Sequence, residues 1–297
     1  MDPHLLRTFV AVVRHGSFSA AARQLGYTQS AVSQHIAALE TDLGTTLLHR
    51  RPVGPTKAGD RLLEHAAPLL LRLDAARADV LRVAGTPPGR LELAMTPLAA
   101  TPRVAEALAG ARRSAPGLQV GVRVEGRQAV VTGVVAGEYT LGLVEGVAAP
   151  SDPLRLSEAG NLTHVAVAEE PLAVLLPDDH PLARRAGLRL GDLVDARWID
   201  APDVAAPLPD LRAAAQSDAP RPSLRYDGTD VTALVTLVAA GHGLAIAPRR
   251  VTAGVPGVRA VPLTLPRLVH RTEALHGHDP GPAAAALAAA LAFQARP

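Results

Sequence analysis

A run of small polar side chains after residue 28 has the composition and spacing of a helix face that contacts nucleic acid. Val32, Ile36, Leu39 and Leu43 recur at helical spacing in this segment and predict one buried side. Thr28 stands at the position expected of an N-cap. The other side presents groups that can donate and accept hydrogen bonds at base edges or phosphates: Gln29, Ser30, Ser33, Gln34 and His35. His35 could instead pack against the short two-stranded wing that is expected after this helix.

Basic residues follow this helix. Arg50, Arg51 and Lys57 flank a Pro/Gly turn between two short extended pieces, which is typical of a wing that contacts backbone phosphates. Thr56 lies in the same segment and joins the predicted DNA contacts. Ser17, an N-cap candidate together with Ser19 for a short preceding helix, completes the predicted DNA-binding set.

These groups need a scaffold, and the flanking residues predict one. A first helix ends at Gly16, a second carries Ala21, Ala22 and Leu25, and Gly26 makes the turn into the polar-faced helix. A small helical bundle with nearly balanced charge is the alternative interpretation. The order of turn, capped polar helix and basic wing favours DNA binding.

Residues 60–88 predict a connecting helix with a heptad seam. Apolar residues in this segment keep the alternating three- and four-residue spacing of a coiled coil. They are Leu62, Ala66, Leu69, Leu73, Ala76, Val80 and Val83. A helix packed on its own domain would show the same stripe, and Pro68 interrupts the helical hydrogen bonds. The position next to a DNA-binding unit favours dimerisation. Residues 85–89, rich in Gly and Pro, predict a hinge.

Residues 89–297 alternate strand-like and helix-like segments, which predicts an α/β fold with mostly parallel sheets. Segments 161–167 and 258–263 are expected to cross between two sheets, so that two lobes enclose a cleft. Lobe one would span about 89–163 and 267–297, and lobe two about 164–266.

Polar residues at strand-to-helix junctions are the candidate ligand contacts in this cleft. Backbone N–H groups at helix starts favour polar or anionic ligands, and ordinary helix capping is the alternative role for each side chain. The predicted set is Thr96, Pro97, Thr101, Asp200, Asp203, Thr229 and His242. The two aspartates favour a ligand with a donor or cationic group.

Catalytic and cofactor signatures are weak. Cysteine is absent, which removes disulfides, thiolate metal sites and a cysteine nucleophile. Gly241-His242-Gly243 lacks the rest of a dinucleotide fingerprint, and neither a P-loop nor a GxSxG motif occurs. His276-Gly277-His278-Asp279 is more typical of a solvated loop than of a metal site. We therefore expect that the protein is not an enzyme and holds no cofactor or metal. We also expect no membrane segment, because the longest apolar run, residues 283–293, is far shorter than a spanning helix.

The first 60 residues resemble the DNA-binding domain of LysR-type transcriptional regulators. The resemblance rests on LLRTFVAVVRHGSFSAAARQLGYTQSAVSQHIAALETDLGTTLLHRR and PTKAGDRL. It extends more loosely through DDHPLA at 178–183, VAAGHGLAIAP at 238–248 and GEYTLGL at 137–143, where Thr140 replaces the usual aspartate. Ser30 stands where many members have proline.

The resemblance implies a winged helix-turn-helix domain over 1–59, a linker helix that pairs subunits over 60–88, and a two-lobed effector domain like periplasmic binding proteins over 89–297. It implies double-stranded promoter DNA with an interrupted inverted repeat, a small-molecule effector, a homodimer or homotetramer, and contact with RNA polymerase. A cytoplasmic location is expected because the sequence shows neither a membrane segment nor a signal peptide. A solute-binding protein without DNA function and an α/β enzyme are the competing hypotheses.

Overall fold

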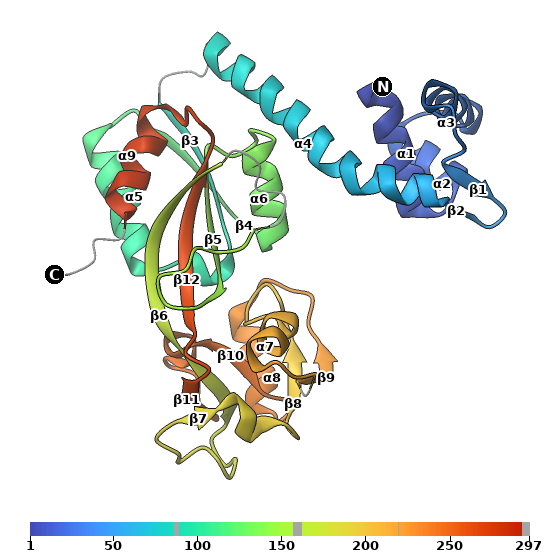
Figure 1. Cartoon of the computed structure of the whole chain (residues 1–297). Helices are drawn as coiled ribbons and strands as arrows, with labels where there is room; N and C mark the ends of the chain where they lie inside the picture. Colours follow the sequence, from blue (N-terminus) through green and yellow to red (C-terminus); the bar gives the residue numbers. More distant parts are fainter. Residues whose placement is uncertain (86–88, 157–161, 219, 293–297) are drawn as a thin grey trace. The chain divides into compact units, whose positions relative to one another are not determined.

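The computed structural model describes residues 1–85, 89–156, 162–218 and 220–292, and for residues 71, 74, 75 and 77–85 it describes the backbone alone. The chain forms two compact units, Met1–Val80 and Leu81–Pro297 (Figure 1). Each unit is described by itself. Most of the predicted hinge, residues 86–88, and the side chains of Val80 and Val83 lie outside the described part of the chain.

Three helices and a ribbon make the N-terminal unit: α1 (Pro3–His15), α2 (Phe18–Leu25), α3 (Gln29–Leu43), β1 (Leu48–Arg50) and β2 (Val53–Pro55). Gly16, Gly26 and Gly44 end the three helices in the left-handed conformation, which glycine adopts without steric cost. Ser17, and not Ser19, is the N-cap of α2 because its hydroxyl accepts from the Ala20 amide. Phe9, Val12, Ile36 and Leu39 form the centre of the core.

Helix α4 (Lys57–Gly85) follows the ribbon and runs through Pro68. Its first turns belong to the N-terminal unit, since Ala66 is buried and Leu62, Leu63 and Leu70 pack against the same core. No helix in the described residues is long and apolar enough to cross a membrane.

A curled sheet organises the C-terminal unit. Its strand order is β4-β3-β5-β12-β6-β11-β7, and β10 also pairs with β6. The strands are β3 (Arg90–Met95), β4 (Gln119–Val124), β5 (Leu141–Ala148), β6 (Thr163–Pro177), β7 (Leu188–Arg189), β10 (Ala245–Pro248), β11 (Val258–Leu265) and β12 (Val269–His276). A separate parallel pair joins β8 (Arg197–Asp200) to β9 (Arg221–Arg225).

The prediction of mostly parallel sheets is wrong. Parallel pairing is found between β3 and β4, β3 and β5, β7 and β11, and β8 and β9. Strand β6 pairs antiparallel with β12, β11 and β10, and β12 pairs antiparallel with β5. A βα alternation predicts parallel neighbours only where a helix follows each strand. The long strands β6 and β12 instead run from one lobe into the other (Figure 1).

The predicted crossing segments also need correction. Residues 163–177 form one strand, which pairs with β12 up to Pro171 and with β10 and β11 from Leu172. Pro171 is tolerated because it stands where β6 changes partners, so the missing N–H interrupts no continuous ladder. Residues 258–263 belong to β11, within lobe two, and β12 makes the second crossing.

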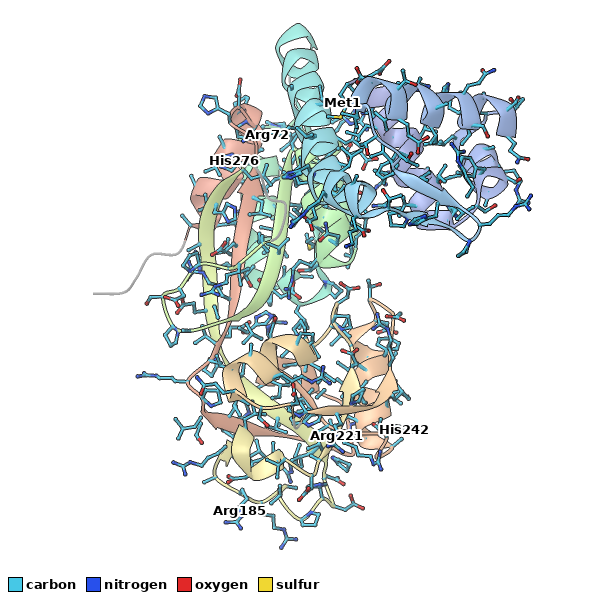
Figure 2. All side chains as sticks on the ribbon, turned by 45° about the vertical axis from the view of Figure 1, so that its right-hand side comes forward. Met1, Arg72, Arg185, Arg221, His242 and His276 are labelled. Carbon is cyan, nitrogen blue, oxygen red and sulfur yellow. The ribbon has the colours of Figure 1, made fainter. Side chains whose placement is uncertain are left out.

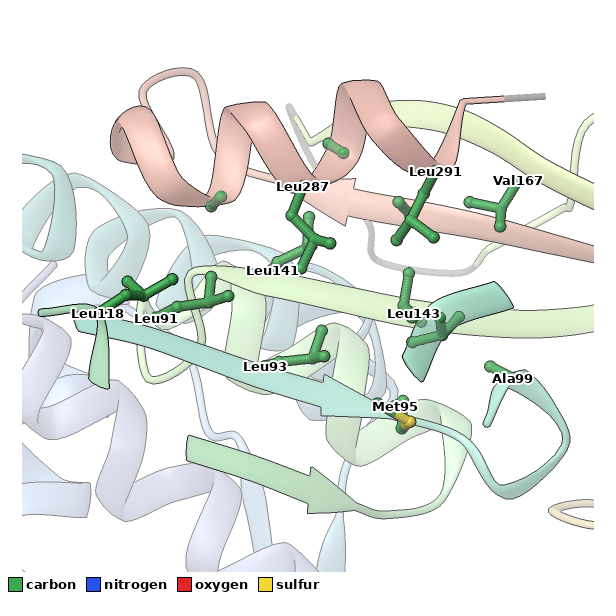
Figure 3. Close-up of a cluster of buried hydrophobic side chains, with 14 residues drawn as sticks. Leu91, Leu93, Met95, Ala99, Leu118, Leu141, Leu143, Val167, Leu287 and Leu291 are labelled. Carbon is green, nitrogen blue, oxygen red and sulfur yellow. The ribbon is translucent and has the colours of Figure 1, made fainter. Parts of the chain in front are cut away.

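Helices cover both faces of lobe one. Helix α5 (Pro102–Ser114) packs beside α9 (Gly281–Leu291) on one face, and α6 (Arg127–Val135) covers the other (Figure 1). The core under α9 joins Leu91, Leu93, Leu141, Leu143 and Leu287 (Figure 3). Lobe two buries its sheet with α7 (Leu208–Ala215), α8 (Val231–Ala239) and the single turns η2 (Leu190–Leu193) and η3 (Arg249–Thr252).

Candidate functional site

The exposed side of α3 carries the polar residues expected there. Val32, Ile36 and Leu39 are fully buried against α1 and α2. Gln29, Ser30 and Gln34 are exposed, and Ser33 is half-buried. The helix therefore presents hydroxyl and amide groups to solvent on the side opposite its buried stripe.

Local hydrogen bonds hold the start of this helix in place. The Thr28 hydroxyl accepts from the Ala31 amide at 3.2 Å and lies 2.9 Å from the Ser30 hydroxyl. The Ser19 hydroxyl of α2 donates to Gln29 Oε1 at 3.1 Å. Thr28 is thus the predicted N-cap, and Gln29 is oriented by the preceding helix before any ligand arrives.

His35 has intramolecular partners on α1. Its Nδ1 lies 3.2 Å from the buried Thr8 hydroxyl. Its ring meets His4 and Tyr27 edge-to-face, with centroids 4.8 and 5.5 Å away. These contacts assign His35 to the packing of α3 on α1 rather than on the wing, and its DNA contact stays a prediction.

The basic residues of the wing differ in their surroundings. Arg50 pairs with Glu40 at 3.2 Å and lies over the Phe18 ring, 5.0 Å from its centroid. Arg51 and Lys57 are exposed, and the described contacts include no ion pair for either. These two cations remain available to phosphates, whereas Arg50 is already engaged.

Thr56 and Ser17 have local capping roles. The Thr56 hydroxyl donates to the Thr46 carbonyl at 2.8 Å and accepts from the Gly59 amide at 3.1 Å. The Ser17 hydroxyl accepts from the Ala20 amide at 3.3 Å. Their predicted DNA contacts are not tested by these bonds.

The predicted seam of α4 divides into two stretches. Leu62 and Ala66 face the core of the N-terminal unit. Leu69 and Leu73 are 39% and 44% exposed, and they line a mostly apolar hollow together with Arg72 of the same helix and with Met1, Pro3 and Leu6. Figure 2 labels Met1 and Arg72 in this part of the chain. The first stretch fits a helix packed on its own domain, and the second leaves leucines without cover.

A small cavity of about 10 Å³, room for about one water molecule, lies where the two lobes meet. Lobe one and the crossing strands contribute residues near the ends of β5, β12 and α6, and lobe two contributes a loop before α7. The lining residues are Leu98, Arg127, Glu145, Gly146, Val147, Ala205, Ala206, Pro207 and His270. Gly146 packs closely here, because a Cβ on it would come within 2.9 Å of Leu154 Cδ2 and 3.3 Å of Arg127 Nη2.

Three polar side chains in this cavity have unsatisfied, buried atoms. Glu145 and His270 are each 3% exposed. Glu145 Oε2, both ring nitrogens of His270 and Arg127 Nε have no hydrogen-bond partner among the described residues. Such groups are rare in folded proteins, since each one carries the cost of lost hydration.

Burial changes the charge of these groups. It raises the pKa of Glu145 from 4.5 to about 7, against the opposing attraction of Arg127. Burial also lowers the pKa of His270, whose Nδ1 lies 3.7 Å from Glu170 Oε2. The proximity of His270 and the Arg250 guanidinium lowers the pKa of Glu170. His270 is therefore a neutral imidazole at neutral pH.

Asp203 and Arg250 of lobe two make polar contacts with lobe one beside the cavity. The Asp203 carboxylate of lobe two accepts from the Arg127 amide at 3.1 Å, so it caps the N-terminus of α6 in lobe one. Arg250 of lobe two pairs with Glu170 at 3.0 Å and donates to the Leu98 carbonyl of lobe one. Charged side chains of lobe two thus bond to lobe one beside the cavity.

The predicted cleft residues are only partly brought together. Asp203 bonds to the cavity-lining Arg127, and Thr96 and Pro97 immediately precede the lining Leu98. Thr96 itself is fully buried and donates to the Leu143 carbonyl at 3.4 Å. Thr101 is the N-cap of α5, and Asp200 pairs with Arg225 at 3.4 Å.

Thr229 and His242 lie away from the cavity. Both are exposed, and neither lines the cavity. The N-cap of α8 is Asp230 and not Thr229, because the Asp230 carboxylate accepts from the Thr232 amide at 2.8 Å. Figure 2 shows His242 at the right-hand surface of lobe two.

Sequence reasoning missed the three central residues of the cavity. Glu145 interrupts the apolar run of β5, and a lone carboxylate in a buried strand is the signal that could have found it. Arg127 is the first residue of α6, after Gly126. His270 had no comparable signal, because its position beside Glu145 and Glu170 depends on strand pairing.

Comparisons with known proteins agree over nearly the whole chain. The family described as bacterial regulatory helix-turn-helix protein, lysR family, matches residues 3–60, and the LysR substrate binding domain matches residues 84–295. The probable regulator LrrA of Synechococcus elongatus is 30% identical over 89% of this chain and 87% of its own length. The regulator BudR of Raoultella terrigena is 32% identical over 85% and 86%.

Solved structures show the same fold. Full-length BenM aligns with a TM-score of 0.55 and 23% identity, over 98% of this chain and 95% of BenM. CbnR, a LysR family transcriptional regulator, aligns with a TM-score of 0.53 and 22% identity, over 98% of both chains.

Proposed function

Because the chain belongs to the LysR family of bacterial transcriptional regulators, we propose that the exposed face of α3 reads a promoter and that the effector binds between the lobes. The family assignment makes the chain a regulator with a DNA-binding and an effector-binding domain, and not an enzyme. The observation that carries the proposal is the capped polar face of α3 opposite a fully buried stripe.

The DNA contacts are of two kinds. Gln29 and Ser33 on α3 contact base edges in the major groove, with Ser30 and Gln34 beside them. Arg51 and Lys57 contact phosphates, which fix the register of the protein on the duplex without reading its sequence. Arg50 supports the wing through Glu40 and Phe18.

The exposed leucines of α4 support a homodimer. Pairing of Leu69 and Leu73 with a second copy would cover apolar surface and place two α3 helices on two half-sites of an interrupted inverted repeat. Two such dimers would join through the effector domains, and bound regulator would contact RNA polymerase. A regulator that binds promoter DNA would act in the cytoplasm.

The effector acts by binding the two arrangements of the lobes unequally, since a ligand shifts an equilibrium only by its difference in affinity for the two states. The contacts that would respond are those of Asp203 with Arg127 and of Arg250 with Leu98. Their residues line or adjoin the cavity.

Fluorescence anisotropy with the full chain and DNA from beside its own gene tests the DNA-binding face. We expect Gln29→Ala to lower affinity by about 1–3 kcal/mol for the specific site and to relax preference at one base pair. Arg51→Ala should weaken all duplexes similarly and reduce the slope of log affinity against log salt by about 1.

The matched control is Arg112→Ala, which removes an exposed arginine of α5 with the same change in charge. It should leave the salt slope unchanged. Unaltered site-specific binding by Gln29→Ala would show that the recognition face is assigned wrongly.

A further inference from the structure

The exposed side of α3 has two flanks, one on each side of its buried stripe. An α-helix turns by about 100° per residue, so Gln29, Ser33 and Glu40 lie along one flank. This flank borders α2 and the wing, since Ser19 donates to Gln29 and Arg50 pairs with Glu40 at 3.2 Å. The phosphate contacts proposed for the wing therefore belong to this side of α3.

The other flank of α3 borders the start of α1. His35 and Asp42 lie along it, and Asp42 pairs with the N-terminal ammonium group at 3.2 Å. The ring centroids of His35 and His4 are 4.8 Å apart, and Tyr27 meets both rings edge-to-face at 5.5 Å. His4, Tyr27 and His35 thus form a ring cluster that joins α1, the turn before α3 and α3 itself.

Tyr27 is the member of the ring cluster with a hydroxyl group. The residue is 41% exposed, and the described contacts include no hydrogen bond for that hydroxyl. The other two tyrosines differ, because the Tyr139 hydroxyl donates to Glu125 and the Tyr226 hydroxyl donates to the Asp230 carbonyl. Tyr27 therefore presents a donor on a ring whose orientation two neighbours hold.

The surroundings of Tyr27 suit an anion. The first turn of α3 holds no acidic residue, and the N-terminus of a helix carries partial positive charge. The carboxylates at this flank are engaged, since Asp2 accepts from the His4 amide at 2.7 Å and Asp42 pairs with the N-terminal ammonium group. A phosphate beside Tyr27 would thus meet no unpaired carboxylate of α1 or α3 among the described contacts.

A helix that lies in the major groove has a phosphate backbone on each side. The wing supplies contacts on one side of α3, and Tyr27 is an exposed donor on the other. We propose that the Tyr27 hydroxyl donates to a DNA phosphate on the groove wall opposite the wing, and that His4 and His35 hold its ring in place. This inference rests on the proposed function, which places the exposed side of α3 in the major groove.

Fluorescence anisotropy with the full chain tests this contact. Tyr27→Phe removes only the hydroxyl, so its thermal unfolding should match that of the wild type. Its affinity for DNA should fall about threefold to tenfold, as expected for one hydrogen bond. The factor should be the same on specific and non-specific duplexes, because phosphates carry no sequence information. The slope of log affinity against log salt should stay unchanged, because no charge is removed.

The matched control is Tyr226→Phe, which makes the same change of atoms in lobe two and should leave DNA affinity unchanged. Duplexes with one neutral methylphosphonate linkage at a time then locate the phosphate. At one linkage, the loss of affinity should be about threefold to tenfold larger for the wild type than for Tyr27→Phe, since the variant has already lost that bond.

A double-mutant cycle tests the positioning role of His4. His4→Ala should lower DNA affinity about twofold or more in the wild type and should have no effect in Tyr27→Phe, where no hydroxyl remains to be positioned. A role of His4 in the stability of the domain alone would lower affinity equally in both backgrounds. Equal losses would therefore remove His4 from the proposal.

Three results would overturn the contact itself: wild-type affinity in Tyr27→Phe, a loss confined to the specific duplex, or equal sensitivity of both proteins to every methylphosphonate. Gln29→Ala is measured in parallel. If Gln29→Ala loses site-specific binding while Tyr27→Phe binds like the wild type, this inference fails and the proposed function stands. If the wild type binds no duplex specifically, the proposed function fails, and the inference fails with it.

Discussion

Glu145 is the residue whose environment departs furthest from that of an ordinary carboxylate. It lies on β5, where its neighbours along the strand pack into the core of lobe one, and it is 3% exposed. Burial raises its pKa from 4.5 to about 7, and Arg127 opposes that rise. The folded protein thus carries the cost of a buried acid at this position.

We expect the stability of the wild type to fall as the pH rises from about 4.5 to about 7. The unfolded chain loses the Glu145 proton near 4.5, whereas the folded chain holds it to about 7, so the unfolded state binds fewer protons in this window. Glu145→Gln removes the titration. Above pH 7 the variant should be more stable than the wild type by up to about 3 kcal/mol.

Urea unfolding at several pH values, followed by the fluorescence of buried Trp198, measures this difference. Glu138→Gln is the control, because its carboxylate is exposed. Parallel stability curves for the wild type and Glu145→Gln would contradict the assignment.

At the scale of elements, α4 belongs to two environments. Ala66 is fully buried in the N-terminal unit, while Leu69 and Leu73, one and two turns later, are partly exposed. Apolar side chains beside the hollow at Met1 and Leu6 are typical of a surface that a second helix covers.

If α4 pairs two subunits as proposed, Leu69→Asp combined with Leu73→Asp should separate them. Burial of unpaired charge in a helix pair is strongly unfavourable, so the variant should sediment as a smaller species and bind promoter DNA poorly. Leu43→Asp changes a leucine of similar exposure outside the seam and should keep the original assembly. An unchanged sedimentation coefficient for the double variant would show that α4 does not form the dimer interface.

The N-cap of α3 allows a test of the recognition element without touching its polar face. Thr28→Ala removes the hydroxyl that accepts from the Ala31 amide, and it should cost about 1 kcal/mol of stability. Thermal unfolding of the full chain, followed by far-ultraviolet circular dichroism, measures the change. Thr41→Ala, which loses only a bond to a carbonyl of the same helix, is the control.

At the scale of the whole effector domain, lobe two completes a helix of lobe one. Helix α6 has no side-chain cap of its own, and Asp203 supplies one from across the cavity. Gly126 makes the approach possible, because a Cβ there would come within 2.6 Å of the Asp203 carboxylate. Opening of the lobes therefore exposes the start of α6.

Asp203→Ala should raise hydrogen exchange at the Arg127 amide. A hydrogen bond to a charged acceptor contributes about 1.5–3 kcal/mol, so the opening equilibrium should change by about tenfold or more. Exchange followed by mass spectrometry on the segment around 126–130 measures it. Asp227→Ala, which removes an exposed carboxylate of lobe two, should leave that segment unchanged, and the same result for Asp203→Ala would show that the lobes do not depend on this contact.

The sequence by itself determined the features that depend on near neighbours in the chain. The polar and buried sides of α3 follow from the repeat of Val32, Ile36 and Leu39, and the caps at Thr28 and Thr101 follow from residue type and position. Helical periodicity and capping act within one or two turns, so they can be recognised without a tertiary structure. The two-lobed α/β class followed from the alternation of elements.

Only the tertiary structure decided the composition of the cavity. His270 lies opposite Val147 and Glu170 because β12 lies between β5 and β6 in one particular register, and the same pairing brings Glu145 and His270 to one cavity, which Arg127 joins from a helix N-terminus. Pairing between strands that lie far apart in the chain has no local signature, and a shift by one residue would turn each side chain to the other face of the sheet. The same reason explains the positions of the predicted cleft residues. His242 and Thr229 follow strands as expected but lie outside the cavity, whereas Asp203 bonds across the lobes to the Arg127 amide.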